Sequence, residues 1–262
     1  MIELDKNKKS IGIIGCSYTH WHDGNCELES YPALIAKKYN EYNVVDLSMP
    51  GSSNDSAYIR LRSFEKLHNI KFDKVIFQIT HYGRFLHMPQ YNVKNTDIFR
   101  EYRQLKNYIY TDGNWKDENW DTITSSYLIS PSLIFKVWYR ERLDFLSNHF
   151  RIKVKDLQKW LYHYLESDML SLVLEKEMHV INGIYGKDNV LLFSWHAGID
   201  SSDLTSFEKC DFPENYIGSM AEMIGPKTFF KLGIDDAPHY DRIGNGVVFK
   251  HLKPRLDKLL TP

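Results

Sequence analysis

Ser17, Asp236 and His239 are the residues whose types and spacing best fit nucleophilic chemistry. Ser17 stands in the polar stretch GCSYT, which ends a short run of isoleucine and glycine, and DAPH near the carboxyl end contains Asp236 and His239. Acyl transfer needs a hydroxyl nucleophile, an imidazole that takes its proton and a carboxylate that orients the imidazole. We therefore expect Ser17 to attack, His239 to act as base and Asp236 to hold His239, with the adjacent Asp235 as an alternative carboxylate.

The reaction also needs hydrogen-bond donors that face the developing oxyanion. Ser17 follows an expected strand, so its own backbone N–H is one candidate donor. Gly51, in the stretch MPGSSND, permits close approach of the backbone and is a candidate for the second donor.

Alternating strands and helices are expected to position these residues. Apolar runs at 11–15, 43–48 and 73–80 predict strands, and the segments between them have helical spacing, the first with Pro32 in its first turn. Repeated strand–helix–strand units of this length predict a parallel sheet covered by helices on both faces. The carboxyl ends of such strands share one edge, where ligands bind.

The second half of the chain is less regular. Residues 86–132 are polar and aromatic, and loops are expected there; helices are expected after 132, including a long one over 155–186. The strand pattern resumes at 189–196, with a possible short strand at 227–234, and a last helix is expected over 242–260. We predict a single domain over 1–262, with a helical and aromatic insertion over 86–187 that forms one wall of the substrate cleft.

The stretches GCSYT and MPGSSND resemble the first two conserved blocks of the SGNH (GDSL-type) hydrolases. The family's first block is Gly-Asp-Ser, and Gly15 and Ser17 match it, whereas Cys16 replaces the aspartate. In the second block a glycine, here Gly51, gives its N–H to the oxyanion hole.

The stretch DAPH is similar to the last block of the same family, Asp-x-x-His. The resemblance implies that Asp236 and His239 are the catalytic carboxylate and imidazole. The resemblance covers the first 85 residues and the chain after the insertion. It implies a flavodoxin-like three-layer α/β/α sandwich with a central parallel sheet. The family contains esterases, lipases, carbohydrate acetylesterases and related acyltransferases.

The family's third block, Gly-x-Asn-Asp, is altered in this sequence. After the strand VIFQI the chain reads THYGRF, with no asparagine to complete the oxyanion hole. Loss of one such donor typically lowers turnover by about 10²–10³-fold. The expected substitutes are His81, Tyr82 and, from the neighbouring loop, Asn54.

Three further side chains near these loops are expected to bind substrate: Tyr18, Arg84 and Trp195. Arg84 fits either a substrate anion or a surface carboxylate, the second being the more common role of such an arginine.

The amino-acid composition limits the classes of protein and of binding partner that fit this chain. The chain has 262 residues, 43% hydrophobic and 26% charged, with a net charge of -1, which is typical of a soluble globular protein and not of a nucleic-acid binder. Aromatic residues make up 14% and suit either a core or a carbohydrate-facing groove. The polar amino terminus and the lack of a long apolar run predict neither a signal peptide nor a membrane span, and the 3 scattered cysteines fit a reducing, cytoplasmic location.

Two other interpretations of the first block stay open. Ser17 taken alone also fits a helix N-cap, and the downstream Asp-x-x-His is what favours the nucleophile. A second set, Cys16, His20, His22 and Cys26, contains four residue types that bind zinc, but its spacing departs from the usual pairs. We expect no metal and no organic cofactor.

These observations predict a serine esterase with an acyl-enzyme intermediate, acting on a small-molecule or glycan ester such as an O-acetyl group on a carbohydrate. An acyltransferase would use the same triad. The alternative from another class is a non-catalytic SGNH-fold module that binds a glycan or protein. The sequence makes no prediction of oligomeric state.

Overall fold

A computed structural model describes the part of the chain that forms the central sheet and the helices around it. The described residues are 4–16, 19, 30–48, 52–80, 85–87, 106–111, 114–119, 127–129, 153, 155–156, 159, 169–194, 210–220, 223, 233–234, 239–240 and 242–260.

The central sheet has the strand order β6-β5-β2-β1-β3-β8-β9. The chain order of its parallel strands is β1 (Lys9–Ile14), β2 (Tyr42–Asp46), β3 (Lys74–Ile79), β8 (Val190–Ser194) and β9 (Tyr216–Ser219). Counted among themselves, they have the order second, first, third, fourth, fifth, which is the flavodoxin-like arrangement. The expected fold class is therefore confirmed.

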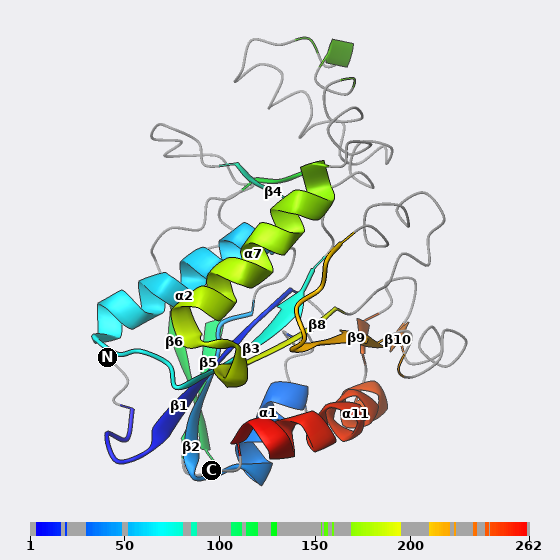
Figure 1. Ribbon diagram of the computed structural model, residues 1–262. Coiled ribbons are helices and arrows are strands. Elements are labelled where there is room, and N and C mark those ends of the chain that lie inside the picture. The colour runs from blue at the N-terminus through cyan, green and yellow to red at the C-terminus, as the bar shows by residue number, and fades with distance from the viewer. Residues whose placement is uncertain are drawn as a thin grey trace.

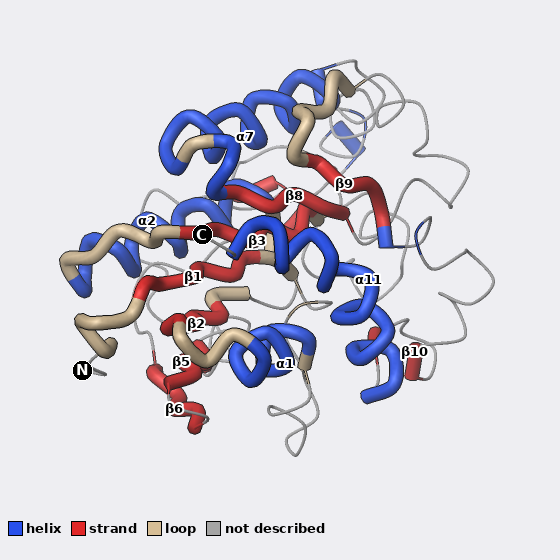
Figure 2. Tube along the Cα trace, turned by 60° about the horizontal axis from the view of Figure 1, so that its bottom comes forward, coloured by secondary structure: helices blue, strands red, loops and turns tan. Residues whose placement is uncertain are grey.

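Helices cover both faces of this sheet (Figure 1). One face carries α1 (Tyr31–Lys38) and α11 (Arg242–Leu260), which lie side by side, and the other carries α2 (Asn54–His68) and α7 (Met169–Tyr185). A short 3₁₀ helix, η3 (Lys187–Asn189), leads from α7 into β8. Figure 2 shows the strands running between the two pairs of helices, which gives the three-layer sandwich.

Side chains along each strand point to alternate faces of the sheet, so the buried apolar residues form two clusters, one on each face. In β1, for example, Ile11 and Ile13 face α1 and α11, whereas Ile14 faces α2 and α7. The central strands are buried on both sides, which is why they are nearly continuous apolar runs. Gly12 is needed because a Cβ there would overlap Leu61 and Phe72 of the α2 side.

Local signals explain where α1 begins. The Ser30 side chain accepts from the backbone N–H of Ala33 at 3.3 Å, and Pro32 stands in the first turn, as expected. Tyr31, also in this turn, is fully buried against the sheet.

The expectation of loops over 86–132 is wrong for four short stretches. A hairpin of β5 (Lys106–Thr111) and β6 (Asn114–Asn119) joins the edge of the main sheet, where β5 runs antiparallel to β2. Another pair, β4 (Phe85–His87) and β7 (Tyr127–Ile129), forms a separate two-stranded sheet. Asp112-Gly113 between β5 and β6 is a common hairpin dipeptide and was the signal for the first pair.

The other elements lie close to their expected positions. The last helix has the expected bounds, and the possible strand over 227–234 is represented by β10 (Gly233–Ile234), which pairs with β11 (His239–Tyr240). The long helix expected over 155–186 is described as α7 from Met169 onward. Within the described ranges, no helix has both the length and the apolar character to cross a bilayer.

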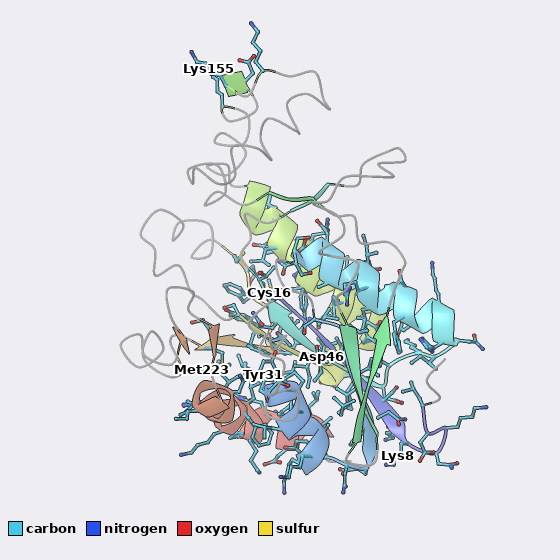
Figure 3. All side chains as sticks on the ribbon, turned by 180° about the vertical axis from the view of Figure 1, so that it is seen from behind. Lys8, Cys16, Tyr31, Asp46, Lys155 and Met223 are labelled. Atoms are coloured by element: carbon cyan, nitrogen blue, oxygen red, sulfur yellow. The ribbon has the colours of Figure 1, made fainter. Side chains whose placement is uncertain are left out.

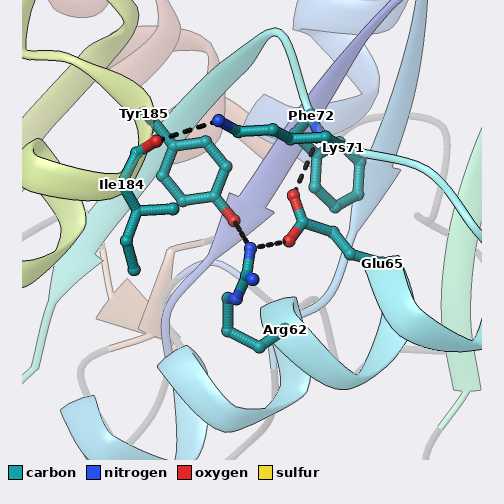
Figure 4. Close-up of polar contacts among 6 residues, drawn as sticks. All are labelled: Arg62, Glu65, Lys71, Phe72, Ile184 and Tyr185. Carbon is teal, nitrogen blue, oxygen red and sulfur yellow. Dashed lines mark hydrogen bonds and ion pairs between the residues drawn. The ribbon is translucent and has the colours of Figure 1, made fainter.

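A buried carboxylate ties α2 to the segment that enters β3 (Figure 4). Glu65 is 3% exposed, and its Oε1 accepts from the backbone N–H of Phe72 at 2.9 Å, while Oε2 binds Arg62. The Arg62 guanidinium also lies 3.5 Å from the Tyr185 hydroxyl at the end of α7. Glu65 therefore links both helices of this face to the start of a central strand.

We predict that Glu65→Ala lowers the free energy of unfolding by about 2 to 3 kcal/mol, because it leaves the buried Phe72 N–H without an acceptor. The matched variant Glu65→Gln keeps that acceptor, so the loss should be about 1 kcal/mol or less. Urea unfolding followed by circular dichroism measures both values. Equal losses for the two variants would contradict the assigned role of the Phe72 hydrogen bond.

Candidate active site

Two loops that carry predicted site residues follow strands at which the order of the parallel strands reverses. From β1 the chain passes to β2 on one side and then to β3 on the other, so the carboxyl ends of β1 and β3 flank the switch point at which ligands bind in such sheets. Ser17 follows β1 at this point, and Gly51 follows β2 on the neighbouring side.

A buried hydrogen-bond network holds the segment after β1. The backbone N–H of Thr19 donates to the carbonyl of Cys16 at 2.9 Å. The Thr19 hydroxyl donates to Oε1 of Gln78 in β3, and Gln78 Nε2 lies 3.5 Å from the Cys16 sulfur. Cys16, Thr19 and Gln78 are each at most 2% exposed. The two residues on either side of Ser17 and Tyr18 are thus joined to each other and to the adjacent strand.

Gly15 is part of the same construction. A Cβ at this position would overlap the Thr19 Oγ1 and would come within 3.1 Å of the Gln78 Cβ. The glycine of GCSYT is therefore required for the packing of Thr19 and Gln78 on the backbone.

Tyr31 connects this network to the last helix. Its hydroxyl donates to Thr19 Oγ1 at 2.7 Å, and its backbone N–H donates to Asn245 Oδ1 at 2.9 Å. Burial is the main reason that the pKa of Tyr31 lies well above its ordinary value; the hydrogen bond to Thr19 opposes this, and electrostatic effects of the nearby Asp46 and Cys16 add to it. The phenol therefore stays protonated and remains a donor. Figure 3 labels Tyr31, Cys16 and Asp46, which lie together in the interior.

Asp46 ends β2 and holds the start of the second loop. Its Oδ1 accepts from the Ser48 backbone N–H at 2.9 Å and from the Ser48 hydroxyl at 2.5 Å. Arg60 of α2, also buried, donates from Nε to the Leu47 carbonyl at 2.8 Å. Burial raises the pKa of Asp46 to about 6 against the effect of Ser48 and Arg60, and burial lowers the pKa of Arg60 to about 10 against the effect of Asp46.

Asn54 joins the second loop to the third. Its Oδ1 accepts from the Thr80 backbone N–H at 2.8 Å, and its Nδ2 lies 3.4 Å from the Thr80 carbonyl. Asn54 begins α2 and Thr80 directly follows β3, so the amide fixes the relative position of the two strand ends. Its predicted donation to an oxyanion stays a prediction.

The backbone of His239 lies in β11, where it pairs with Ile234 of β10, and α11 begins shortly afterwards at Arg242. Asp236 belongs to the segment that connects β10 to β11. The other predicted site residues lie outside the described part of the chain: Ser17, Tyr18, Gly51, His81, Tyr82, Arg84, Trp195 and Asp236.

The metal alternative is described only in part. Cys16 is buried with its sulfur beside Gln78, and His20, His22 and Cys26 lie outside the described residues. Across the described ranges, no three His, Cys, Asp or Glu side chains form a group that could hold a metal ion.

Sequence reasoning missed the residues that hold the loops. Gln78 was visible as a polar residue inside the apolar strand VIFQI, and Asp46 as a charge at the end of another. A buried strand carries such residues only where they find hydrogen-bond partners. Tyr31 and Asn245 gave no comparable signal, because both stand among ordinary helix residues.

Comparisons with known proteins give likenesses in structure only. No family model matches the sequence, and no curated protein matches it. Among solved structures, the chain is similar to TesA, with 12% identity over 96% of this chain and 99% of that one and a TM-score of 0.48. It is also similar to the psychrotrophic esterase EstA from Pseudoalteromonas sp. inhibited by monoethylphosphonate, with 10% identity over 97% of this chain and 100% of that one and a TM-score of 0.48.

We predict that the free energy of unfolding of the wild type, compared with that of the Asp46→Asn variant, falls as the pH rises from 4 to 7. The folded-state pKa of Asp46 is raised to about 6, so its favourable contribution is fully present below the unfolded value of 3.8 and is lost through the folded value. The expected change between these two pH values is about 2.4 kcal/mol, out of a full change of about 3 kcal/mol at about 1.4 kcal/mol per pH unit between the two pKa values. Urea unfolding of both proteins at several pH values measures it, and parallel curves would contradict a raised pKa at Asp46.

We predict that Gly15→Ala lowers the free energy of unfolding by about 1 to 3 kcal/mol, because the added methyl displaces Thr19 and Gln78. The control is Gly183→Ala in α7, where an added Cβ meets nothing within 4 Å. This control should raise stability by up to about 1 kcal/mol, since alanine is the better helix former. Thermal and urea unfolding measure the change in the free energy of unfolding for both variants. A Gly15→Ala variant as stable as the wild type would refute the tight packing at that glycine.

Proposed function

We propose that this protein is a serine esterase that works through an acyl-enzyme. Ser17 is the nucleophile, His239 the general base and Asp236 the carboxylate that orients the imidazole. The backbone N–H groups of Ser17 and Gly51 bind the oxyanion, and no metal or organic cofactor takes part.

One observation carries the proposal. Tyr31 is hydrogen-bonded both to Thr19, two residues after Ser17, and to Asn245, in the first turn of the helix that follows His239. Chain connectivity keeps Ser17 within one residue of Cys16, about 3.8 Å between Cα atoms. Two segments more than 200 residues apart in sequence are therefore held at one place, beside the switch point of the sheet.

In the proposed reaction the Ser17 Oγ attacks the ester carbonyl carbon while His239 accepts the hydroxyl proton. The resulting tetrahedral oxyanion is bound by the backbone donors, with Asn54, His81 and Tyr82 as candidate third donors. Collapse breaks the ester C–O bond, and the leaving alkoxide takes the proton from His239. Water then attacks the acyl-enzyme by the same steps in reverse, which releases the acid and restores Ser17.

The proposed substrate is a small acyl ester of a polar alcohol, such as an O-acetyl group on a carbohydrate. The high aromatic content suits a sugar-facing groove, and Tyr18, Arg84 and Trp195 are the proposed contacts. Replacement of water by a second alcohol would make the same triad an acyltransferase.

The proposal predicts that a fluorophosphonate probe labels the protein at Ser17 and that the protein hydrolyses p-nitrophenyl acetate. Ser17→Ala should abolish labelling and lower kcat/KM by at least about 10³-fold, and His239→Ala should do the same. Ser63→Ala, a serine of α2, is the matched control and should keep both activities. Peptide mapping by mass spectrometry identifies the labelled serine.

A folded wild type that neither labels nor turns over would exclude the esterase and would favour the non-catalytic binding module. Labelling at another serine would place the nucleophile elsewhere. Turnover that is slow in water but rises with an added sugar acceptor, still dependent on Ser17, would identify the acyltransferase.

A further inference from the structure

We propose that Tyr31 is a positioning residue that sets the separation between Ser17 and His239. This inference rests on the proposed function, because it assigns Tyr31 a role in the proton transfer between those two residues. Tyr31 does not touch the reacting atoms in this scheme; it acts through Thr19 on one side and through Asn245 on the other.

The two polar groups of Tyr31 point to different parts of the chain. The phenol oxygen bonds the Thr19 side chain at 2.7 Å, and the backbone nitrogen bonds the Asn245 side chain at 2.9 Å. A side-chain contact thus holds the segment after β1, while a main-chain contact holds α11. One residue of α1 therefore relates the two segments that carry the proposed nucleophile and base.

The surroundings leave Tyr31 little freedom. Its side chain is fully buried, and its ring meets the Phe193 ring of β8 edge-on, with centroids 6.1 Å apart and planes at 69°. Thr19 and Asn245 are at most 2% exposed, so water does not compete for these hydrogen bonds. The contacts involve uncharged groups on a sheet–helix framework, which is the kind of support that holds a site in one geometry.

Two other tyrosines on this face provide a comparison. The Tyr39 hydroxyl donates to Asp257 Oδ1 at 2.7 Å, and the Tyr42 hydroxyl donates to the Leu260 carbonyl at 2.8 Å. Both attach the far end of α11, which is the end away from His239. Tyr31 attaches its first turn, and it also reaches the segment that carries Ser17.

The test compares Tyr31→Phe with Tyr42→Phe. Each variant loses one buried tyrosine hydroxyl on the same face of the sheet, but only the first loses a contact to the Ser17 segment. Active sites are titrated with the fluorophosphonate, so that kcat is expressed per competent site and any misfolded fraction is removed from the comparison. Urea unfolding gives the stability of each variant separately.

Tyr31→Phe should lower kcat and the labelling rate constant by about 10- to 100-fold with KM of p-nitrophenyl acetate nearly unchanged, the result of a small misplacement of reacting groups. Tyr42→Phe should lose stability but keep kcat within about twofold. Thr19→Val also removes the contact to Gln78 and should lower kcat at least as much as Tyr31→Phe, whereas Thr19→Ser should keep kcat near the wild-type value. The double variant Tyr31→Phe/Thr19→Val should be no slower than Thr19→Val alone.

Equal kcat values per titrated site for Tyr31→Phe, Tyr42→Phe and the wild type would overturn the positioning role and leave the esterase intact. Additive defects of Tyr31→Phe and Thr19→Val would also overturn it, since the two residues would then act independently. A wild type without labelling and turnover would remove the proposed function and the role of Tyr31 together.

Discussion

The hydrogen bond from the Tyr31 phenol to the Thr19 hydroxyl lies where the parallel sheet changes the direction in which strands are added. At such a point two strand ends diverge, and the backbone after them must turn without the support of a neighbouring ladder. Thr19, Gln78 and Cys16 supply that support through side chains, and Tyr31 extends it to the first turn of α11. This contact therefore joins the loop after β1 to the helix that follows the predicted base.

The polar groups that hold the segment after β1 are neutral in the described part of the chain. The network around Thr19 contains hydroxyl, amide and thiol groups, which cost less to bury than charges provided that each finds a partner. Asp46 and Arg60 are ionisable groups buried at the start of the second loop, and burial shifts the pKa of each against the charged form. Both arrangements hold loops whose next residues are proposed to meet the substrate. Buried polar contacts specify one arrangement of such loops more strictly than apolar packing does, at a cost in stability.

Three tyrosines on the α1 face of the sheet attach α11 at its two ends. Tyr39 and Tyr42 hold its last turns near the amino-terminal edge of the sheet, and Tyr31 holds its first turn through Asn245. Because His239 stands just before this helix, the angle and the height of α11 on the sheet govern where the imidazole can reach. A long helix held at both ends is a stiffer support than a loop, which suits the proposed role of His239 as the base for Ser17.

The sequence by itself determined the sandwich, because its central strands are apolar on both faces and its helices carry clear start signals such as Ser30 and Pro32. It also gave the prediction of a Ser-His-Asp triad, through residue types and the Asp-x-x-His spacing, and this stays a prediction. The pairing of β5 with the edge strand β2 and the hydrogen bonds of Tyr31 to Thr19 and Asn245 were decided only by the tertiary structure. Strand pairing at a sheet edge, and a hydrogen bond between residues 214 positions apart in sequence, depend on which surfaces meet after folding. The local pattern of apolar residues does not predict such contacts.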